Sequence, residues 1–249
     1  MNIGLYQSAS SLSALERWQD VVSQNITSSQ ATGYRKRTVN FSAEMAGEIQ
    51  PDSHARLGRD RGTPSLFPRI NTGVNFDFGE NLPTQGNLDI AIQGDGFFAI
   101  QRPDGSKAYT RSGAFQMRLD RTIVTSGGDI VLSSTDSPML LRSEGGTIVV
   151  DSNGSISQGG VPIAKFSVVQ FADNSRLRPI SGGSFLAPDG VNPEKVKEPA
   201  LIQGYLEGSN TSSLREMVDM VLISRAYEAN QKIISTVDEA MGKTLEALG

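Results

Sequence analysis

Side chains able to carry out covalent chemistry are scarce in this sequence. The chain holds 23 basic and 27 acidic residues, no cysteine and a single histidine, His54. Without cysteine there is neither a disulfide framework nor a thiolate nucleophile. A zinc site or a Ser-His-Asp arrangement would depend on His54 alone, and we expect that residue on the surface of an irregular segment. These residue types argue against thiol, zinc and serine-triad enzymes.

Other short motifs resemble binding or catalytic patterns, and each is incomplete. The Gly-x-Gly turn at 94–96 lacks the third glycine and the strand-to-helix context of a dinucleotide site. The Asp-x-Asn-Gly run at 151–154 begins like a calcium loop, but the remaining ligands are missing. Asp89 and Asp95 make a poor acid pair, because we expect the first in a strand and the second in a turn. We therefore predict no enzyme, no cofactor, no metal and no small-molecule substrate.

Charge and hydropathy narrow the class of protein further. The net charge is -4, so the basic excess typical of nucleic-acid binders is missing. The sequence contains no apolar run of the roughly 18 residues that a membrane span needs. Its first residues do not form a basic region followed by an apolar run, so we predict no cleaved signal peptide. These features predict a cytoplasmic protein unless export follows a route without a cleaved signal.

A long helix is expected at the N-terminal end, over about residues 3–31. Apolar residues alternate at spacings of three and four, which is the heptad pattern of a helix that packs on another helix. Thr32 and Gly33 should end this helix, with Gly33 as a left-handed cap. The apolar positions of this stripe are Leu5, Leu12, Leu15, Val22 and Ile26.

A second long helix is expected over about residues 213–248. Ser213 and Glu216 have the spacing of a capping box at its start. The alternation of three and four continues through the whole helix. The apolar positions of this stripe are Met220, Ile223, Tyr227, Ile234, Val237, Met241 and Leu248.

The region between the helices divides into an arm and a β-rich part. Residues 41–84 are rich in glycine and proline and are expected to be an irregular arm. Residues 85–204 alternate short apolar runs with turn residues, which predicts a sandwich or barrel-like β domain with its longest strand at 164–171. The helices, 1–40 and 205–249, would form a discontinuous helical domain. The predicted fold class is α+β, an all-β centre flanked by two terminal helices.

Individual polar residues also carry expectations. Arg111, at the end of a predicted strand, is expected to form a structural salt bridge. Asn25 and Asn210 lie near helix ends and are expected to cap helices or stabilise turns. Trp18 lies beside the first stripe and is expected to pack there.

The two apolar stripes need a surface to pack against. Each helix would be about 40 Å long, which exceeds the width of a small β domain. The helices can pair as an intrachain hairpin, pack against other copies of the chain, or do both. An adhesin or secreted β-rich binding module would explain the β domain but not stripes at both ends.

Residue patterns in three blocks of the sequence, at 23–36, 86–115 and 203–230, resemble those of the flagellar basal-body rod and hook protein family. The first is Ser-Gln-Asn-Ile-Thr at 23–27 with Thr-Gly-Tyr-Arg-Lys at 32–36. The second runs from Gly-Asn-Leu-Asp-Ile-Ala-Ile at 86–92 to Tyr-Thr-Arg-Ser-Gly-Ala-Phe at 109–115. The third is Gln-Gly-Tyr-Leu-Glu-Gly-Ser-Asn at 203–210, followed by Arg-Ala-Tyr-Glu-Ala-Asn at 225–230.

This resemblance implies a structural axial subunit of the rod. Such proteins leave the cell through the flagellar type III export apparatus without a cleaved signal and polymerise in the periplasm. Their terminal helices pair as a coiled coil in the polymer, so the two stripes become the expected assembly interface. The implied partners are copies of the chain and other rod or hook axial proteins. The length favours a rod subunit over a hook protein. The run Tyr-Leu-Glu-Gly-Ser-Asn at 205–210 and the modest β domain favour the proximal-rod subtype (FlgF type), with the distal-rod subtype (FlgG type) as the close alternative.

Overall fold

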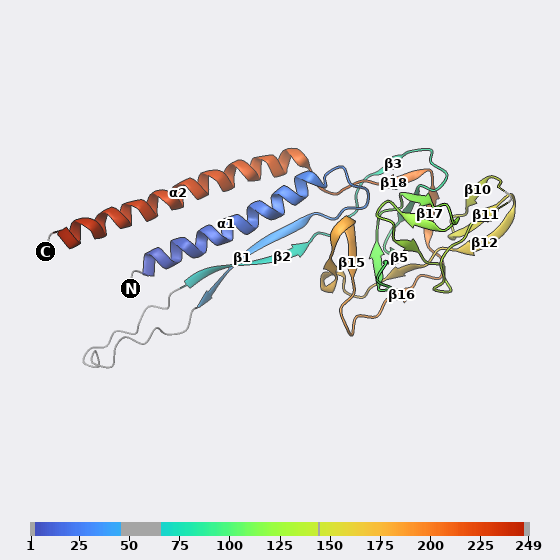
Figure 1. Ribbon diagram of the computed structural model, residues 1–249, viewed down its shortest axis with the longest axis horizontal. Helices are drawn as coiled ribbons and strands as arrows, with labels where there is room; N and C mark the ends of the chain where they lie inside the picture. Colours follow the sequence, from blue (N-terminus) through green and yellow to red (C-terminus); the bar gives the residue numbers. More distant parts are fainter. Residues whose placement is uncertain (1–2, 46–65, 144, 247–249) are drawn as a thin grey trace. The chain divides into compact units, whose positions relative to one another are not determined.

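The computed structural model describes residues 3–45, 66–143 and 145–246 (Figure 1). Within these ranges the chain is α+β, with one long helix at each end and strands between them, which confirms the predicted class at this level. Residue contacts divide the chain into two units. The helical unit comprises residues 1–26, 37–73 and 212–249, and the β unit comprises 27–36 and 74–211.

The helical unit contains α1 (Ile3–Thr27), β1 (Arg37–Met45), β2 (Leu66–Val74) and α2 (Ser213–Glu246). The two helices run antiparallel, and β1 and β2 follow α1 on the side away from α2 (Figure 1). β1 and β2 pair as a two-stranded sheet. The helix α1 is thus the middle layer of this unit.

The segment at 41–84, which was predicted to be irregular, contains strands in its described parts. Residues 37–45 and 66–74 form β1 and β2, and residues 81–83 form a further strand. β1 is rich in the β-branched and aromatic residues that favour a pleated strand, whereas β2 contains Pro68 and Gly73, which sequence reasoning took as signs of a loop. The proposed arm at 41–84 therefore stays a prediction; its middle, with His54, lies outside the described residues.

The end of α1 also differs from the prediction. The helix ends at Thr27, and Gly33 follows several residues later with a φ of 67°. A Cβ at Gly33 would lie 2.3 Å from the Ser112 backbone nitrogen, and the Gly33 N–H donates to the Glu207 carbonyl at 2.7 Å. Gly33 is therefore required for a close approach inside the β unit and is not the helix cap.

The β unit is built mainly on a nine-stranded sheet. Seven strands follow the order β14-β15-β6-β5-β9-β8-β7, and β13 pairs with both β5 and β16. Short 3-10 turns, η1 (Asn174–Arg176) and η2 (Ser181–Gly183), flank β14. The strands of this sheet are β5 (Phe97–Gln101), β6 (Lys107–Thr110), β7 (Phe115–Met117), β8 (Ile123–Thr125), β9 (Ile130–Val131), β13 (Val168–Gln170), β14 (Arg178–Pro179), β15 (Ser184–Leu186) and β16 (Glu194–Lys195).

Three smaller sheets complete this unit. One has the order β10-β11-β12, and the others are the antiparallel pairs β4 with β17 and β3 with β18. Their strands are β3 (Asn81–Pro83), β4 (Ile90–Gln93), β10 (Ile148–Val150), β11 (Ser155–Gln158), β12 (Val161–Lys165), β17 (Ala200–Gln203) and β18 (Tyr205–Glu207).

The strand predicted over 164–171 is two strands. β12 pairs with β11, whereas β13 pairs with β5 and β16. Between them, Phe166 forms an isolated bridge to Ser133. The single apolar run was misread because its two halves join different sheets, and no local pattern signals a change of partner.

Apolar side chains fill both faces of β5. Phe98 and Ile100 are fully buried in one cluster, while Phe97 and Ala99 belong to a second cluster with Tyr109. Because successive side chains of a strand point to opposite faces, β5 lies between the two clusters. The β unit therefore encloses its own core.

Candidate assembly surface

The predicted stripes of α1 and α2 meet in the helical unit. Leu15, Val22 and Ile223 form a buried apolar cluster, and Val22 and Ile223 are only 2% and 1% exposed. Trp18, Ile26, Met220, Ala226 and Tyr227 pack against this cluster and are partly buried. The two stripes therefore contact one another within the chain over the first half of α2.

The remaining stripe positions are less enclosed. Leu12, Ile234 and Val237 are half-buried, and Met241 is 41% exposed. The Leu5 side chain lies outside what the structure describes, as does Leu248 altogether. Burial along the stripe thus decreases toward the C-terminal end of α2.

Asn25 joins three elements of the helical unit. Its side-chain amide donates to the Arg37 carbonyl at 2.9 Å and to Glu216 Oε2 at 3.0 Å. Its Oδ1 accepts from the Arg37 N–H at 2.9 Å. Asn25 is 1% exposed and Glu216 is 1% exposed, so this network is internal. Asn25 was expected to cap a helix or stabilise a turn, and these contacts instead join α1, β1 and the start of α2.

The start of α2 follows from the same network. The helix begins at Ser213, and the Glu216 N–H donates to the Ser212 carbonyl at 3.1 Å, so Ser212 occupies the cap position. The Glu216 carboxylate was expected to reach back along its own helix, and the structure places one of its oxygens against Asn25.

The strand β1 packs on the opposite side of α1. The rings of Trp18 and Phe41 meet edge to face with centroids 5.5 Å apart. Arg37 donates to the Gln24 side chain at 2.6 Å. The packing role predicted for Trp18 is confirmed, and α1 is covered from two directions.

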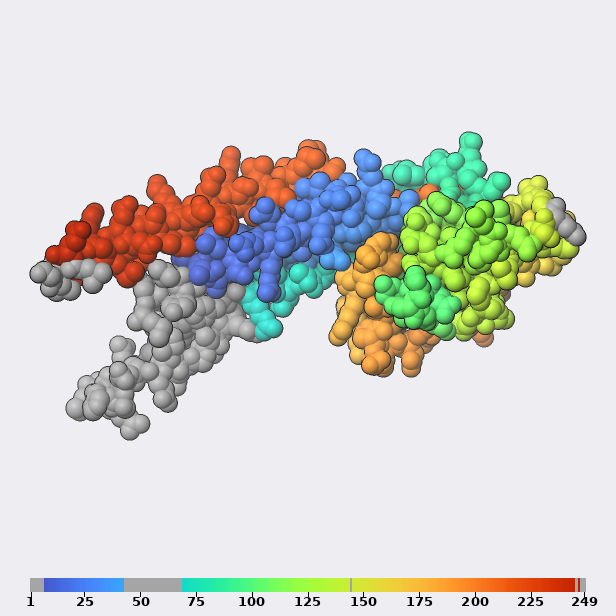
Figure 2. Space-filling model, viewed as in Figure 1, coloured from blue at the N-terminus to red at the C-terminus, as the bar shows by residue number. Residues whose placement is uncertain are grey.

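The other side of α2 exposes a row of apolar side chains, which we call the outer α2 face. At about 100° per residue, four of these positions (214, 217, 218 and 221) fall opposite Ile223, and positions 222 and 233 lie about a quarter-turn from it. Figure 2 shows α2 at the surface over its length, with its upper edge uncovered in this view. The face consists of Leu214, Met217, Val218, Val221, Leu222 and Ile233, which are between 50% and 74% exposed.

Sequence reasoning did not include these residues in the assembly interface. The heptad template follows one stripe, and the outer α2 face occupies a second one. The signal was nevertheless present, because Leu214, Val218, Val221 and Leu222 recur at helical spacing. A row of exposed apolar residues of this kind marks an interaction surface more often than chance exposure does.

A buried ion cluster holds the ends of the β unit together, and we call it the Arg-Glu clasp. Arg35 Nη1 lies 2.7 Å from one Glu207 oxygen, and Arg111 Nε donates to the other. Arg111 also donates to the carbonyls of Ile92, Gly94 and Gly96, so most of its N–H groups are satisfied. The expected salt bridge of Arg111 is confirmed.

Burial decides the electrostatics of the clasp. Arg35 and Glu207 are 3% and 1% exposed, and burial lowers the pKa of the Arg35 guanidinium, while the nearby Glu207 opposes that shift. The Phe78 ring lies over both guanidinium groups, 5.7 Å from Arg35 and 5.2 Å from Arg111. The buried positive and negative groups stabilise one another, because removal of either would leave a charge without water or a counter-charge.

The Asn210 side chain joins neighbouring chain segments through hydrogen bonds to their backbone groups. Its Oδ1 accepts from the Lys36 N–H at 2.6 Å, and its amide donates to the carbonyls of Asn75 and Asp77. The turn role expected for Asn210 is thus a link between the segment that enters the β unit and the segment that leaves it.

The residues considered for catalysis have structural contacts. The Asp89 carboxylate accepts from the Thr84 hydroxyl at 2.6 Å and lies beside Gly86. Among residues 3–45, 66–143 and 145–246, no group of three or more His, Asp or Glu side chains is placed to hold a metal. Over the same ranges, no helix combines the length and the apolarity needed to cross a bilayer.

Comparison with known proteins decides the family. The family described as flagellar basal body rod FlgEFG protein C-terminal matches residues 202–247, and flagellar hook protein FlgE/F/G D1 domain matches 91–158. The flagellar basal-body rod protein FlgG of Buchnera aphidicola subsp. Acyrthosiphon pisum is 31% identical, with 96% of this chain and 97% of the relative covered. The rod protein FlgF of Rhizobium meliloti is 31% identical, with 100% and 99% covered. The chain belongs to the flagellar basal-body rod protein family.

The chain is thus a structural subunit of the flagellar basal-body rod, in a family of structural proteins and not of enzymes. The rod protein FlgF of Caulobacter vibrioides, 29% identical, is also covered over 99% of its length. The C-terminal family match contains Glu207 and the whole of α2, including the outer α2 face. The D1 match contains Arg111 and the strand β5. The clasp therefore links both matched regions of this rod protein.

Proposed function

We propose that this rod subunit polymerises helically, with the outer α2 face of one subunit packing on the terminal helices of its neighbours. The observation that carries the proposal is the exposure of Leu214, Met217, Val218, Val221, Leu222 and Ile233. Full burial of such a side chain contributes about 1.5–3 kcal/mol before the costs of association. A face that packs on a different face of the next subunit can extend into an open helical filament, as a rod requires, when the rotation between subunits does not close a ring.

The predicted stripes complete this interface. In the polymer, α1 and α2 pair as a coiled coil, starting from the contact among Leu15, Val22 and Ile223. The less enclosed positions Ile234, Val237 and Met241 then pack against helices of neighbouring subunits. The decrease in burial along α2 supports this division, because the N-terminal half of the stripe already has a partner within the chain.

The substitutions Val218→Ser and Leu222→Ser together test the interface. The double variant should keep the monomer's circular dichroism and lose at least nine-tenths of the polymer recovered by sedimentation and electron microscopy. Glu228→Ser with Lys232→Ser is the matched control, because both positions are exposed on α2 at the same spacing. Rods assembled at the wild-type level by the Val218/Leu222 variant would refute the proposed contact.

The proposal extends to location and export. The subunit reaches the periplasm through the flagellar type III export apparatus without a cleaved signal, and there it joins copies of itself and other rod or hook axial proteins. Blocking the export apparatus should retain the full-length chain in the cytoplasm. Processing of the N-terminus during normal export would contradict this route.

The subtype is the proximal-rod one, with the distal-rod subtype as the alternative. The two FlgF relatives cover 100% of this chain, whereas the FlgG relatives of Buchnera and Agrobacterium cover 96% and 93% of it. The fuller match to FlgF proteins supports the proximal choice. Imaging of basal bodies from a strain without this chain tests it, because the missing axial segment should be the proximal one.

A further inference from the structure

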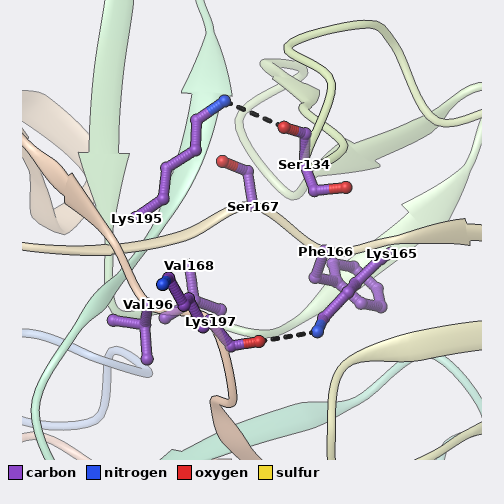
Figure 3. A pocket seen from close by; sticks show the side chains of 8 residues that line it. All are labelled: Ser134, Lys165, Phe166, Ser167, Val168, Lys195, Val196 and Lys197. Carbon is purple, nitrogen blue, oxygen red and sulfur yellow. Dashed lines mark hydrogen bonds between the residues drawn. The ribbon is translucent and has the colours of Figure 1, made fainter.

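A pocket of about 150 Å³ opens in the β unit beside β12, β13 and β16 (Figure 3). Phe166, Val168 and Val196 supply apolar walls, and the lysine side chains at 165, 195 and 197 surround the opening. One water needs roughly 10–15 Å³ of cavity volume, so this pocket has room for a short side chain. Nothing in the rod family matches above assigns this pocket a ligand.

Two of the lysines are held in place by backbone carbonyls. Lys165 Nζ donates to the Lys197 carbonyl at 2.8 Å, and Lys195 Nζ donates to the Ser134 carbonyl at 2.8 Å (Figure 3). Each ammonium has three donors, so both keep at least one free N–H after these contacts are made. Lysines fixed in this way lose less rotamer entropy when an anion binds.

The positive charge at the opening is not neutralised by the chain itself. Asp136 pairs with Lys195 at 2.9 Å and with Lys107 at 3.4 Å. Lys165 and Lys197 make no ion pair within the described part of the chain, although Glu194 and Glu198 adjoin this segment in sequence. Two ammonium groups therefore remain without a carboxylate.

A buried hydroxyl gives an independent sign of an incomplete site. Ser167 is 2% exposed, and its Oγ has no hydrogen-bond partner among the described residues. Figure 3 shows this hydroxyl between the Lys195 and Ser134 side chains, at the wall of the pocket. Buried hydroxyl groups normally have a partner, so a polar atom is missing from this region.

We propose that the pocket receives an aspartate or glutamate side chain from a neighbouring axial subunit. Its carboxylate lies between Lys165 and Lys197, and its CH₂ stem rests on Phe166 and Val196. The apolar walls favour a carboxylate with an aliphatic stem over inorganic phosphate, which has no apolar surface to bury. The identity of the occupant rests on the proposed assembly function, whereas the pocket's selectivity does not.

The selectivity is tested on the unassembled full chain by nuclear magnetic resonance with butyrate, butyramide and inorganic phosphate as probes. Butyrate should produce saturable shifts at residues 165–168 and 195–197, and the other two probes should shift them far less. The double variant Lys165→Gln, Lys197→Gln should weaken butyrate binding roughly tenfold. Lys232→Gln on α2 is the matched control and should leave it unchanged. Equal shifts with butyramide, no saturable shift, or an unaffected double variant would overturn the pocket.

The occupant is tested in assembled rods with a zero-length carbodiimide, which joins a lysine amine to a carboxylate in direct contact. Peptide mass spectrometry should find Lys165 or Lys197 joined to an Asp or Glu of another subunit in rods and not in monomers. Rods without this link would overturn the occupant and leave the proposed assembly intact. If rods do not form, the assembly proposal fails, and the butyrate titration alone decides the pocket.

Discussion

The two units of this rod protein differ in how completely they bury their apolar side chains. In the β unit, β5 has Phe98 and Ile100 buried on one face and Phe97 and Ala99 buried on the other. In the helical unit, the outer α2 face is at least half exposed. The β unit thus encloses its own core, whereas the helical unit leaves a row of apolar side chains exposed. In the proposed assembly, neighbouring subunits would cover that row, so the two units would divide stability and assembly between them.

Both units nevertheless use buried polar groups to fix distant segments. In the β unit the Arg-Glu clasp joins residues far apart in the chain, and in the helical unit Asn25 does so for α1, β1 and α2. The clasp consists of three buried charged side chains, whereas the Asn25 network contains a single one, Glu216. Disruption of the clasp should therefore have the larger effect.

The largest expected loss of stability comes from Arg111→Met in the β unit. The substitution removes a buried ion-pair partner and leaves the Glu207 charge and several carbonyls short of donors, which costs about 3–5 kcal/mol in the free energy of unfolding. Urea denaturation followed by far-UV circular dichroism measures this loss of stability. Arg102→Met is the control, because Arg102 is 34% exposed in a surface pair with Asp104. A loss below about 1 kcal/mol would show that the clasp is not a stabilising element.

A smaller loss is expected from Ile223→Ala in the helical unit. Ile223 is 1% exposed and belongs to the buried cluster with Leu15 and Val22. Because this cluster has few buried members, we expect the free energy of unfolding to fall by about 2–3 kcal/mol. The Trp18 fluorescence reports the helical unit, because Trp18 packs against the same cluster. The control Ile233→Ala, on the outer α2 face, should change monomer stability by less than about 0.5 kcal/mol. Equal losses for the two isoleucines would abolish the distinction between the two sides of α2.

Asn25→Ala should cost less, about 1–2 kcal/mol, because it leaves buried backbone groups of Arg37 and a Glu216 oxygen without their present partner. The unfolding midpoint of the helical unit should fall while that of the β unit stays the same. Gln24→Ala, which removes an exposed contact with Arg37, is the control. Parallel shifts of both units would mean that the division into two units has no energetic basis.

The smallest effect concerns acid and Asp136. A hydrogen bond from Lys195 and the charge of Lys107 hold the pKa of this carboxyl below its usual range. Because the folded-state pKa is the lower one, the stabilisation is present above the unfolded pKa and is lost as the pH falls through the folded one. For this half-exposed group we expect less than about 1 kcal/mol.

Asp136→Asn isolates this contribution. Asn tolerates the residue's φ of 60°, so the backbone should not change. The difference in unfolding midpoint between wild type and variant should shrink to zero as the pH falls below the ordinary range of aspartate, near 3.9. A difference that persists at the lowest pH would mean that charge is not its source.

Local periodicity made the two helices and their apolar stripes predictable. The seven-residue spacing of Leu15 and Val22 on α1, and the three-residue spacing of Met220 and Ile223 on α2, reflect the helical repeat itself. The stripes could therefore be recognised without knowledge of the fold. The pairing of β1 with β2 was missed, because it joins two segments across an intervening stretch rich in glycine and proline. The salt bridge of Arg111 was expected, but its partner Glu207 lies 96 residues away and no sequence pattern links the two.

The outer α2 face and the lysine pocket show two further limits of sequence reasoning. The heptad pattern describes a single apolar stripe on a helix. It therefore identified the stripe of α2 that contains Ile223 and missed the outer α2 face, although the spacing of that face is also regular. The pocket depends on the meeting of β12, β13 and β16, and each of its lysines looks like an ordinary surface residue in sequence. Only the tertiary structure separates Lys197, which lines the pocket, from Lys232, which lies exposed on α2.

Amide hydrogen exchange on monomer and polymer is the sharpest test of the difference between the two units, because it reports each segment separately. We predict that β5 and its neighbours are strongly protected in both states. Residues 230–241 of α2, which lie beyond the cluster shared with α1, should exchange readily in the monomer and become protected only in the polymer. Equal and strong protection of residues 230–241 in both states would show that the helical unit needs no neighbour, and would contradict the proposed assembly.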